Sequence, residues 1–388
     1  MMKTESLVVG ASVIGGVAAK ELARRGIDTI LLSDKPHVGK SGKCTSIISA
    51  TGLPKTGIDY QDAKLHDIYG ANIRCGKAHM AVRRKNPVAY VLDRFRLDEL
   101  SVEQAQDAGA ELKTSTRFEK WEPTENRNND DTTNSASKTA NDRYMNGGTA
   151  QTAAGPIRTD YLVGADGIAS AVARQSGFPV LQHFVVAWEG EFDSANLPEP
   201  DVVDVFLDIP GLFGWAVPAG EKTVRVGLAT TTAVQLAEHK NRLLQSPVIH
   251  AMVHNAKKVR EFHHTIPLHY RQQTQKGNVM LVGDAAGQVK ATTGGGIVFG
   301  ALCAHELADA TKQHANGGTL DYESRWRAKY AGPLDGHRRI RKVLDAMPTS
   351  LAAIGLQAFS AIGGRALLEN KADMDFILST AAPKRASS

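Results

Sequence analysis

The segment Val8-Val9-Gly10-Ala11-Ser12-Val13-Ile14-Gly15 decides the fold. Ser6–Val9 predicts a short buried strand before it, and Val13–Arg25, followed by Gly26, predicts a helix. Thr29–Leu32 predicts a second strand. A strand, a helix and a strand with short connections form a βαβ unit, which opens a doubly wound parallel sheet. The sequence therefore predicts an α/β fold.

The glycines of this turn predict a binding site for a pyrophosphate. Gly10 permits a tight turn from strand to helix, and Gly15 lets the helix pack close to the sheet with its N-terminus facing phosphate. Between them, a position that is usually glycine is Ser12, which is small and donates a hydrogen bond. Asp34 follows the second strand, where a carboxylate accepts a bond from a ribose hydroxyl. The alternative for Asp34 is a solvated acid in a loop.

Two further segments extend the predicted dinucleotide site. Leu92-Asp93-Arg94 precedes a predicted helix at Arg96–Ala108, and Arg94 is placed to meet phosphate or carbonyl groups of a cofactor. The segment 163–167 follows a buried run and places Asp166 and Gly167 at a strand end. A glycine-flanked acid at such an end suits a site formed by loops at the sheet edge.

A fourth motif lies late in the chain. Asp284 follows a predicted strand at Val279–Val282 and precedes Gly294-Gly295-Gly296-Ile297 and a helix expected from about Gly295 to Thr311. Asp284 is placed to bind a ribityl or ribose hydroxyl. The glycine run lets backbone amides lie against a pyrophosphate and a ring system.

In order and spacing, these four motifs resemble those of the glutathione-reductase-type FAD proteins, in their p-hydroxybenzoate-hydroxylase-like branch. The resemblance implies FAD as the cofactor, in place of a nicotinamide dinucleotide. The residues expected to bind it are Gly10, Ser12, Gly15, Asp34, Lys43, Cys44, Arg94, Asp166, Gly167, Asp284, Gly294, Gly295, Gly296 and Ile297.

The middle of the chain has a different pattern. Strand-like runs at Phe184–Trp188, Val202–Leu207 and Val224–Ala229 are separated by turn residues, which favours a mostly antiparallel sheet. Asn126–Gln151 is polar and predicts an exposed hairpin tip or a disordered insertion. Tyr322–Leu378 has a helical pattern.

These patterns together predict the domain organisation. We expect a Rossmann-like FAD-binding domain of the glutathione-reductase type, a second domain built on a mostly antiparallel sheet, and a helical C-terminal tail. The FAD-binding domain is expected at residues 1–55, 85–180 and 275–315, with the polar insertion at 126–151; the substrate domain at 56–84 and 181–274; and the helical region at 316–388.

Composition excludes several classes of protein. A net charge of +5 over 388 residues is too small to indicate nucleic-acid binding. Three scattered cysteines favour a reducing compartment and argue against structural zinc, and we expect no metal site. No signal peptide is expected, and no run approaches the about 18 apolar residues of a membrane span. The expectation is a cytoplasmic protein, with peripheral membrane contact left open.

Within its branch the chain resembles the archaeal and photosynthetic geranylgeranyl reductases, including the digeranylgeranylglycerophospholipid reductases. Lys43-Cys44-Thr45 carries the family's cysteine, although Thr45 stands where Gly or Ala is usual. Phe213–Pro218 is close to the family's YxWxFP, with Phe213 in place of Tyr and Val217 in place of Phe. Gly283–Ile297 matches closely.

This resemblance implies the activity and further site residues. The expected reaction is saturation of isolated double bonds in a geranylgeranyl lipid or diphosphate. Reduced FAD would deliver hydride from its N5, and a donor or water would deliver a proton. Phe213, Trp215 and Pro218 are expected to line the substrate cavity, and Cys44 to lie near the flavin with a catalytic role. No second GxGxxG is present, so NAD(P)H would dock transiently, or ferredoxin would supply electrons.

Other interpretations of these residues and of the whole chain stay open. Phe213 and Trp215 are core residues in the alternative reading, and a lone cysteine such as Cys44 is more often a small buried apolar residue. His263 and His264 are expected to have a surface or core role. The rival functions are an FAD-dependent aromatic monooxygenase and an electron-carrying flavoprotein without substrate chemistry of its own.

Overall fold

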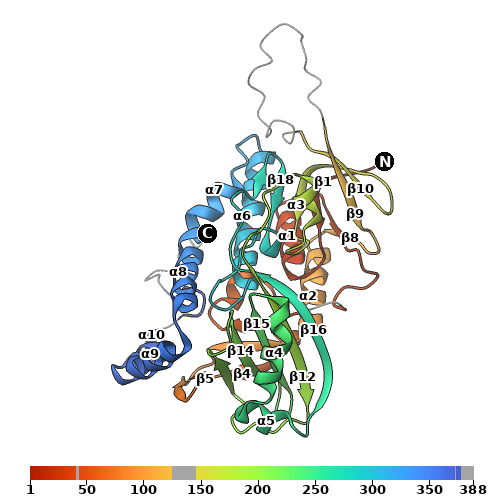
Figure 1. The fold of residues 1–388 in the computed structure, drawn as a ribbon. Helices are drawn as coiled ribbons and strands as arrows, with labels where there is room; N and C mark the ends of the chain where they lie inside the picture. Colours follow the sequence, from red (N-terminus) through yellow and green to blue (C-terminus); the bar gives the residue numbers. More distant parts are fainter. Residues whose placement is uncertain (41–42, 125–145, 372, 377–388) are drawn as a thin grey trace.

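A mostly parallel sheet forms the centre of the upper half of the molecule. The computed structural model describes residues 1–40, 43–124, 146–371 and 373–376. β1 pairs in parallel with β11 on one side and with β2 on the other, so that Val9 lies opposite Gly164 and Leu32. The carboxyl ends of these strands therefore meet at one edge (Figure 1). The sheet contains β17 (Gln275–Lys276), β18 (Val279–Leu281), β11 (Ile157–Gly164), β1 (Met2–Val9), β2 (Thr29–Leu32), β8 (Glu111–Lys113), β9 (Phe118–Pro123) and β10 (Gly148–Thr152).

Both faces of this sheet are covered. Val8, Leu31 and Val163 pack on one face against helices α1 (Val13–Arg24), α2 (Arg94–Asp107) and α6 (Ile297–Ala315). Alternate side chains, such as Leu7 and Leu162, pack on the other face against β9, β10 and α3 (Ala171–Gln175). This alternation follows from the two-residue period of a strand, and it confirms the predicted α/β fold.

A second sheet fills the lower half of the molecule (Figure 1). All of its neighbouring strands pair antiparallel except β13 and β5, which confirms the mostly antiparallel prediction. α4 (Ala233–Leu244) and α5 (Pro247–Val253) cover one face. The strand order is β16 (Lys257–Pro267), β12 (Phe184–Asp193), β15 (Val224–Thr230), β14 (Phe213–Pro218), β13 (Val202–Phe206), β5 (Gly70–Cys75) and β6 (Ala78–Arg83).

A small third sheet packs on the opposite face of the second sheet. It consists of β3 (Ile47–Ser49), β7 (Ala89–Leu92) and β4 (Lys64–Ile68), in that order. It joins ranges that the sequence assigned to different domains, because β4 lies within 56–84 and its partner β7 within 85–180.

Several predicted boundaries differ from the structure. Helix α2 begins at Arg94, not Arg96, because the carboxylate of Asp93 caps it by accepting from the backbone N–H groups of Phe95 and Arg96 at 2.9 and 3.3 Å. Helix α6 begins at Ile297 and ends at Ala315. The predicted insertion was too long, because Gly148–Thr152 forms β10; residues 125–145 lie outside the described residues.

The C-terminal region is helical as predicted only as far as Lys371. It contains α7 (Tyr322–Trp326), a π-helical turn (Arg327–Ala331), α8 (Gly332–Ala346), α9 (Thr349–Ala361) and α10 (Gly364–Lys371). Residues 373–376 leave the helix and return to the body, because Asp375 forms a buried ion pair with Lys290 at 2.5 Å. Among the described residues no single helix is long and apolar enough to cross a membrane, although the pair α9 and α10, bent by 73°, passes that test together.

Candidate functional site

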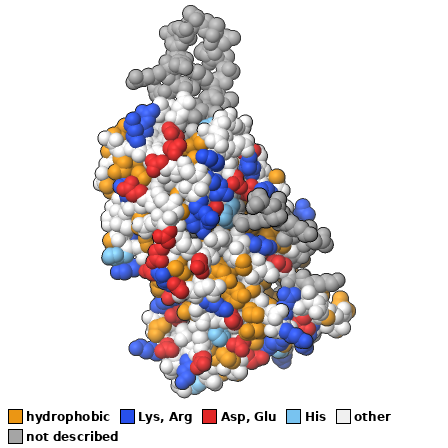
Figure 2. Space-filling model, turned by 180° about the vertical axis from the view of Figure 1, so that it is seen from behind, with side chains coloured by type: hydrophobic (Ala, Val, Ile, Leu, Met, Phe, Trp, Pro, Cys, Tyr) orange, Lys and Arg blue, Asp and Glu red, His pale blue; other side chains and the backbone are white. Residues whose placement is uncertain are grey.

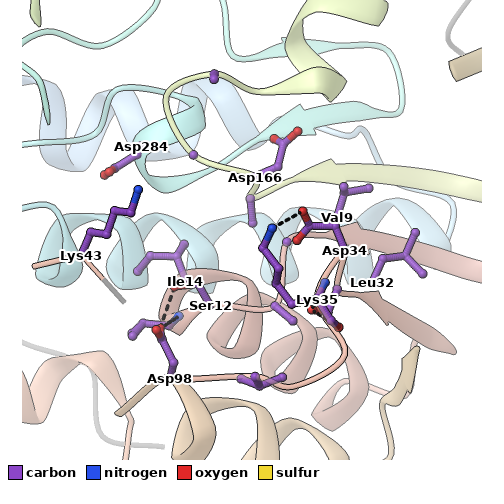
Figure 3. Close-up of a pocket in the computed structure, with 18 of the residues that line it drawn as sticks. Val9, Ser12, Ile14, Leu32, Asp34, Lys35, Lys43, Asp98, Asp166 and Asp284 are labelled. Atoms are coloured by element: carbon purple, nitrogen blue, oxygen red, sulfur yellow. Dashed lines mark hydrogen bonds and ion pairs between the residues drawn. The ribbon is translucent and has the colours of Figure 1, made fainter. Parts of the chain in front are cut away.

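A pocket of about 500 Å³ lies at the carboxyl edge of the parallel sheet (Figure 3). Its walls come from the turns after β1, β2, β11 and β18 and from the segment around Cys44. Of the predicted cofactor residues, Gly15 and Gly295 do not line it. The others do: Gly10, Ser12, Asp34, Lys43, Cys44, Arg94, Asp166, Gly167, Asp284, Gly294, Gly296 and Ile297.

Two glycines are required by close backbone contact. Gly10 has φ +110°, and a Cβ on it would lie 2.5 Å from the carbonyl oxygen of Ala165. A Cβ on Gly15 would lie 1.7 Å from the carbonyl oxygen of Gly10. Neither position has room for a side chain, so the turn can have this shape only with glycine at both positions.

The N-terminus of α1 is held by a buried ionic cluster. Asp98 accepts from the Ser12 hydroxyl at 2.7 Å and from the Val13 backbone N–H at 2.9 Å. Arg94 donates to Asp98 at 3.2 Å and to the Ser12 oxygen at 2.8 Å. Burial lowers the pKa of Arg94, but Asp98 outweighs it, so this guanidinium is firmly charged. The cluster keeps a cation beside the helix N-terminus, where a phosphate is best bound.

Two acids lie across the pocket from that cluster (Figure 3). One oxygen of Asp166 accepts from the backbone N–H groups of Ala171 and Val172 at 2.7 and 3.1 Å, at the start of α3. The other oxygen is buried without a partner among the described residues. Asp284 follows β18, and its side chain is exposed to the pocket. Burial raises the pKa of both carboxyls.

Asp34 lies at the rim of the pocket. Its side chain is 53% exposed and pairs with Lys35 at 3.1 Å. The position suits a ribose at the outer end of a dinucleotide, because the pair breaks at little cost at an exposed site. The residues as a set fit FAD: a cation and a helix N-terminus for the pyrophosphate, and acids for the hydroxyl groups.

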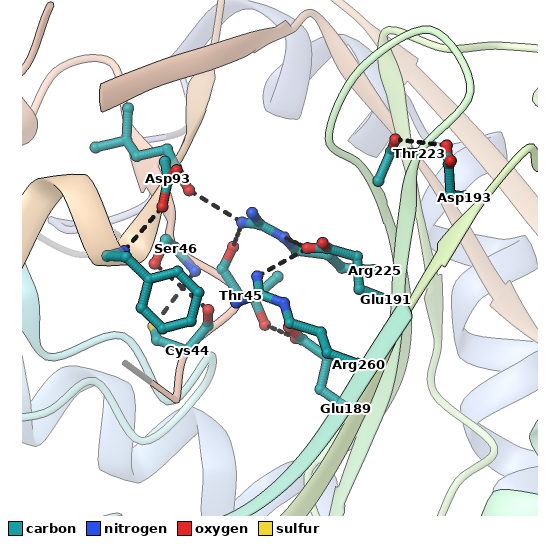
Figure 4. Close-up of polar contacts among 12 residues, drawn as sticks. Cys44, Thr45, Ser46, Asp93, Glu189, Glu191, Asp193, Thr223, Arg225 and Arg260 are labelled. Carbon is teal, nitrogen blue, oxygen red and sulfur yellow. Dashed lines mark hydrogen bonds and ion pairs between the residues drawn. The ribbon is translucent and has the colours of Figure 1, made fainter. Parts of the chain in front are cut away.

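The segment around Cys44 forms another wall of the pocket. The Cys44 Sγ accepts from the Ser46 backbone N–H at 3.3 Å, and Ser46 has φ +53°, an uncommon conformation for a residue other than glycine. Arg225 of β15 donates to the Thr45 carbonyl at 2.7 Å (Figure 4). The second sheet thus holds Cys44 in place at the pocket.

Comparison with known proteins identifies the family. The model of the FAD binding domain family matches residues 3–330. The chain belongs to this family. This confirms the prediction of FAD as the cofactor.

Relatives with curated names cover nearly the whole chain. The digeranylgeranylglycerophospholipid reductase of Methanosarcina acetivorans is 28% identical, over 85% of this chain and 82% of its own. Digeranylgeranylglycerophospholipid reductase 2 of Methanothermobacter thermautotrophicus is 25% identical, over 89% of both chains. The crystal structure of a geranylgeranyl bacteriochlorophyll reductase-like protein from Thermoplasma acidophilum has a TM-score of 0.79 at 19% identity, covering 92% of this chain and 91% of that one. These findings confirm the family resemblance seen in the sequence.

The predicted substrate residues lie apart from the FAD pocket. Phe213 and Trp215 share one face of β14, with ring centroids 5.7 Å apart, and join an apolar cluster between the second and third sheets. The Trp215 Nε1 donates to Glu189 at 3.0 Å. Pro218 points to the opposite face and lines a separate cavity of about 240 Å³.

His264 is a pocket residue that the sequence interpretation missed. Its expected surface or core role was wrong, because the pairing of β16 with β12 places His264 opposite Ala187 and its ring in the FAD pocket. Its Nδ1 is buried without a partner among the described residues. Burial, with Arg94 and Lys43 nearby, lowers its pKa to about 4. The alternation of side chains along a strand places His263 and His264 on opposite faces, but it does not show which face meets a pocket.

Asp98 was also missed. Its signal was present in the sequence, because Arg94 and Asp98 are spaced i,i+4 on a helix whose first turn meets the glycine turn.

Proposed function

We propose that this chain is an FAD-dependent reductase that saturates isolated double bonds of geranylgeranyl chains in the synthesis of archaeal-type membrane lipids. The observation that carries the proposal is the extent of the similarity to the digeranylgeranylglycerophospholipid reductases, which spans the second sheet as well as the FAD pocket. We also propose the division into domains given by the sequence, except that β3 and β7 pair with β4 in the sheet that packs on the second domain.

The residues of the pocket have distinct roles in this proposal. Bound FAD, once reduced, supplies the hydride. Arg94, Ser12 and the N-terminus of α1 hold the pyrophosphate, and Asp166 and Asp284 accept bonds from hydroxyl groups of the cofactor. Cys44 lines the pocket and would lie near the flavin ring. NAD(P)H or a ferredoxin delivers the electrons.

The aromatic pair gives the prenyl chain its binding surface. Phe213 is partly exposed beside the buried Trp215, at one end of an apolar cluster that includes Leu212 and Ile266. A flat apolar wall of this kind suits an isoprenoid chain and excludes water from the alkene. Pro218 is the last residue of β14, and its side chain lies on the opposite face of the sheet, where it lines the separate cavity.

Helix α9 supports contact with the membrane that carries the lipid. It has no charged residue, and one face packs on the β5–β6 edge through Leu356. Its other face exposes Leu351 and Ile354 at 55% and 61%. Figure 2 shows hydrophobic side chains on the lower half of the face in view, interspersed with basic and acidic ones. Such a surface suits the interface of an anionic membrane.

One experiment tests the function. The purified protein is reduced anaerobically and given geranylgeranyl diphosphate or a digeranylgeranyl phospholipid, and products are read by mass. A gain of about two mass units for each saturated bond is expected. If FAD is bound but neither lipid changes mass, the reductase proposal fails, and NAD(P)H-dependent oxygen consumption with aromatic acids then tests the monooxygenase alternative.

A further inference from the structure

A buried carboxyl group contacts the residue that follows Cys44 in the wall of the FAD pocket. Glu189 lies on β12 with none of its surface exposed. It points from the same face of the second sheet as Ala187, which is opposite His264. Its Oε2 accepts from the Thr45 hydroxyl (Figure 4) and from the Trp215 Nε1. Thr45 follows Cys44, which lines the pocket.

The two arginines near Glu189 form ion pairs with a different acid, Glu191. Arg225 of β15 and Arg260 of β16 each donate to Glu191 at 2.8 Å. These bonds outweigh burial and lower the pKa of Glu191. Glu189 receives bonds only from neutral donors, and its Oε1 has no partner among the described residues.

A buried carboxylate without a contacting cation is strongly disfavoured, and the group takes up a proton instead. Burial raises the pKa of Glu189 above its usual range, although Thr45, Arg225, Trp215 and Arg260 act in the opposite direction. Lys43 is exposed, and His264 is the neighbouring titratable group on β16. The unpartnered Oε1 is consistent with a neutral acid.

We propose that Glu189 is the proton reserve of the reductase, held as a neutral acid and connected to the pocket through the Thr45 hydroxyl. The inference rests on the proposed function. One alkene carbon receives a hydride, two electrons from the reduced cofactor, and the other receives a proton. In the neutral acid the bond to Thr45 is reversed, so that the Oε2–H of Glu189 donates to the Thr45 oxygen. The O–H bond of Thr45 breaks as the C–H bond forms, the Glu189 proton moves to the Thr45 oxygen in its place, and water later returns a proton to the carboxylate. Glu189 acts through Thr45 and is a positioning residue in this sense.

Infrared spectroscopy of the FAD-bound protein at neutral pH tests the protonation state directly. A carboxylic-acid C=O band is expected in the wild-type protein. Its intensity should fall in Glu189→Gln, where any remainder comes from other acids with a raised pKa such as Asp166 and Asp284, and should be unchanged in Glu238→Gln, whose side chain is exposed on α4. A band that persists unchanged in Glu189→Gln overturns the neutral acid.

Single-turnover kinetics tests delivery. Reduced protein is mixed with geranylgeranyl diphosphate, and flavin reoxidation is followed. Glu189→Gln and Thr45→Val are each expected to slow reoxidation about 10²-fold, with FAD content and melting temperature near wild type and a pH profile that loses its alkaline limb. Wild-type rates in either variant overturn the proposal. If Glu189→Gln fails to fold, Thr45→Val decides.

The infrared and kinetic measurements distinguish a failure of this inference from a failure of the proposed function. If the wild-type protein turns over neither lipid, the reductase function and the delivery step both fail. The infrared band then still reports whether Glu189 is a neutral acid.

Discussion

At the scale of single residues, the FAD pocket depends on a few contacts that tolerate no added atom. Gly10 and Gly109 separate two effects, because both have positive φ, +110° and +103°, but only Gly10 has backbone within 3 Å of a Cβ. The comparison distinguishes strain of the dihedral angle from collision at the pocket.

Gly10→Ala is therefore expected to lose most bound FAD and to destabilise the protein by more than the about 1 kcal/mol of an unfavourable dihedral. Flavin absorbance per chain and denaturant unfolding measure the two effects. Gly109→Ala, the matched control, should keep its FAD. Equal flavin loss in both variants would show that collision with Ala165 is not the cause.

His264 predicts a pH dependence of stability in the FAD-free protein. Its pKa is about 4 in the fold and 6.5 in the unfolded chain, so the unfolded chain binds more protons between these values. Stability should fall as pH drops from 6.5 to 4, by on the order of 1–2 kcal/mol after allowance for the open pocket.

His264→Asn should remove that part of the slope in urea unfolding between these pH values. His269→Asn is a useful comparison, because His269 also has a pKa lowered to about 4 but does not line the pocket. An unchanged slope in His264→Asn would contradict the prediction.

At the scale of elements, the C-terminal segment 373–376 is fastened to the body by a buried ion pair. Lys290 and Asp375 have side-chain exposures of 7% and 0%. Asp375 also accepts from the Ser49 hydroxyl, and its backbone carbonyl contacts His337. These contacts join α8–α10 to the turn before α6.

Asp375→Ala should destabilise the protein by about 3–5 kcal/mol, because it leaves the ammonium of Lys290 buried without a counter-charge. Glu369→Ala removes an ion pair with the exposed Arg365 and a bond from the Arg83 backbone N–H at 3.2 Å, and should cost about 1–2 kcal/mol. Denaturant unfolding of both variants gives the comparison. A similar cost for both would mean that segment 373–376 is not held by Lys290.

Helix α9 carries the prediction for membrane contact. Replacing Leu351 and Ile354 by Ser should lower co-sedimentation with anionic vesicles at least several-fold, since each side chain contributes about 1.5–3 kcal/mol when fully buried. Val234→Ser is the control, because Val234 is 90% exposed on α4. Equal loss in the control, or no loss in the double variant, would exclude α9 as the contact.

At the scale of the whole molecule, FAD binding couples the parallel sheet to the second sheet. The pocket is lined by both, through the turns of β1 and β11 and through His264 of β16. FAD at 100 times its dissociation constant should stabilise the folded state by about 2.7 kcal/mol. Thermal unfolding with and without FAD measures this, and an unchanged melting temperature would contradict the assignment of the pocket.

The sequence by itself determined the fold class and the cofactor, and it grouped most of the residues that line the pocket. The glycine turns, Asp166 and Asp284 follow buried strands, and parallel strands bring their carboxyl ends together, so local pattern was sufficient to group them. We could therefore predict that these residues, although distant in the chain, lie close together, and this prediction needed no information on side-chain packing.

Only the tertiary structure decided the rest. Which face of β16 looks into the pocket depends on its register with β12, and that placed His264 in the site. The neutral surroundings of Glu189 depend on where Arg225 and Arg260 direct their bonds. The separation of Pro218 from Trp215 depends on which layer covers each face of β14. These are properties of contacts between strands far apart in the sequence, and a local pattern does not contain them.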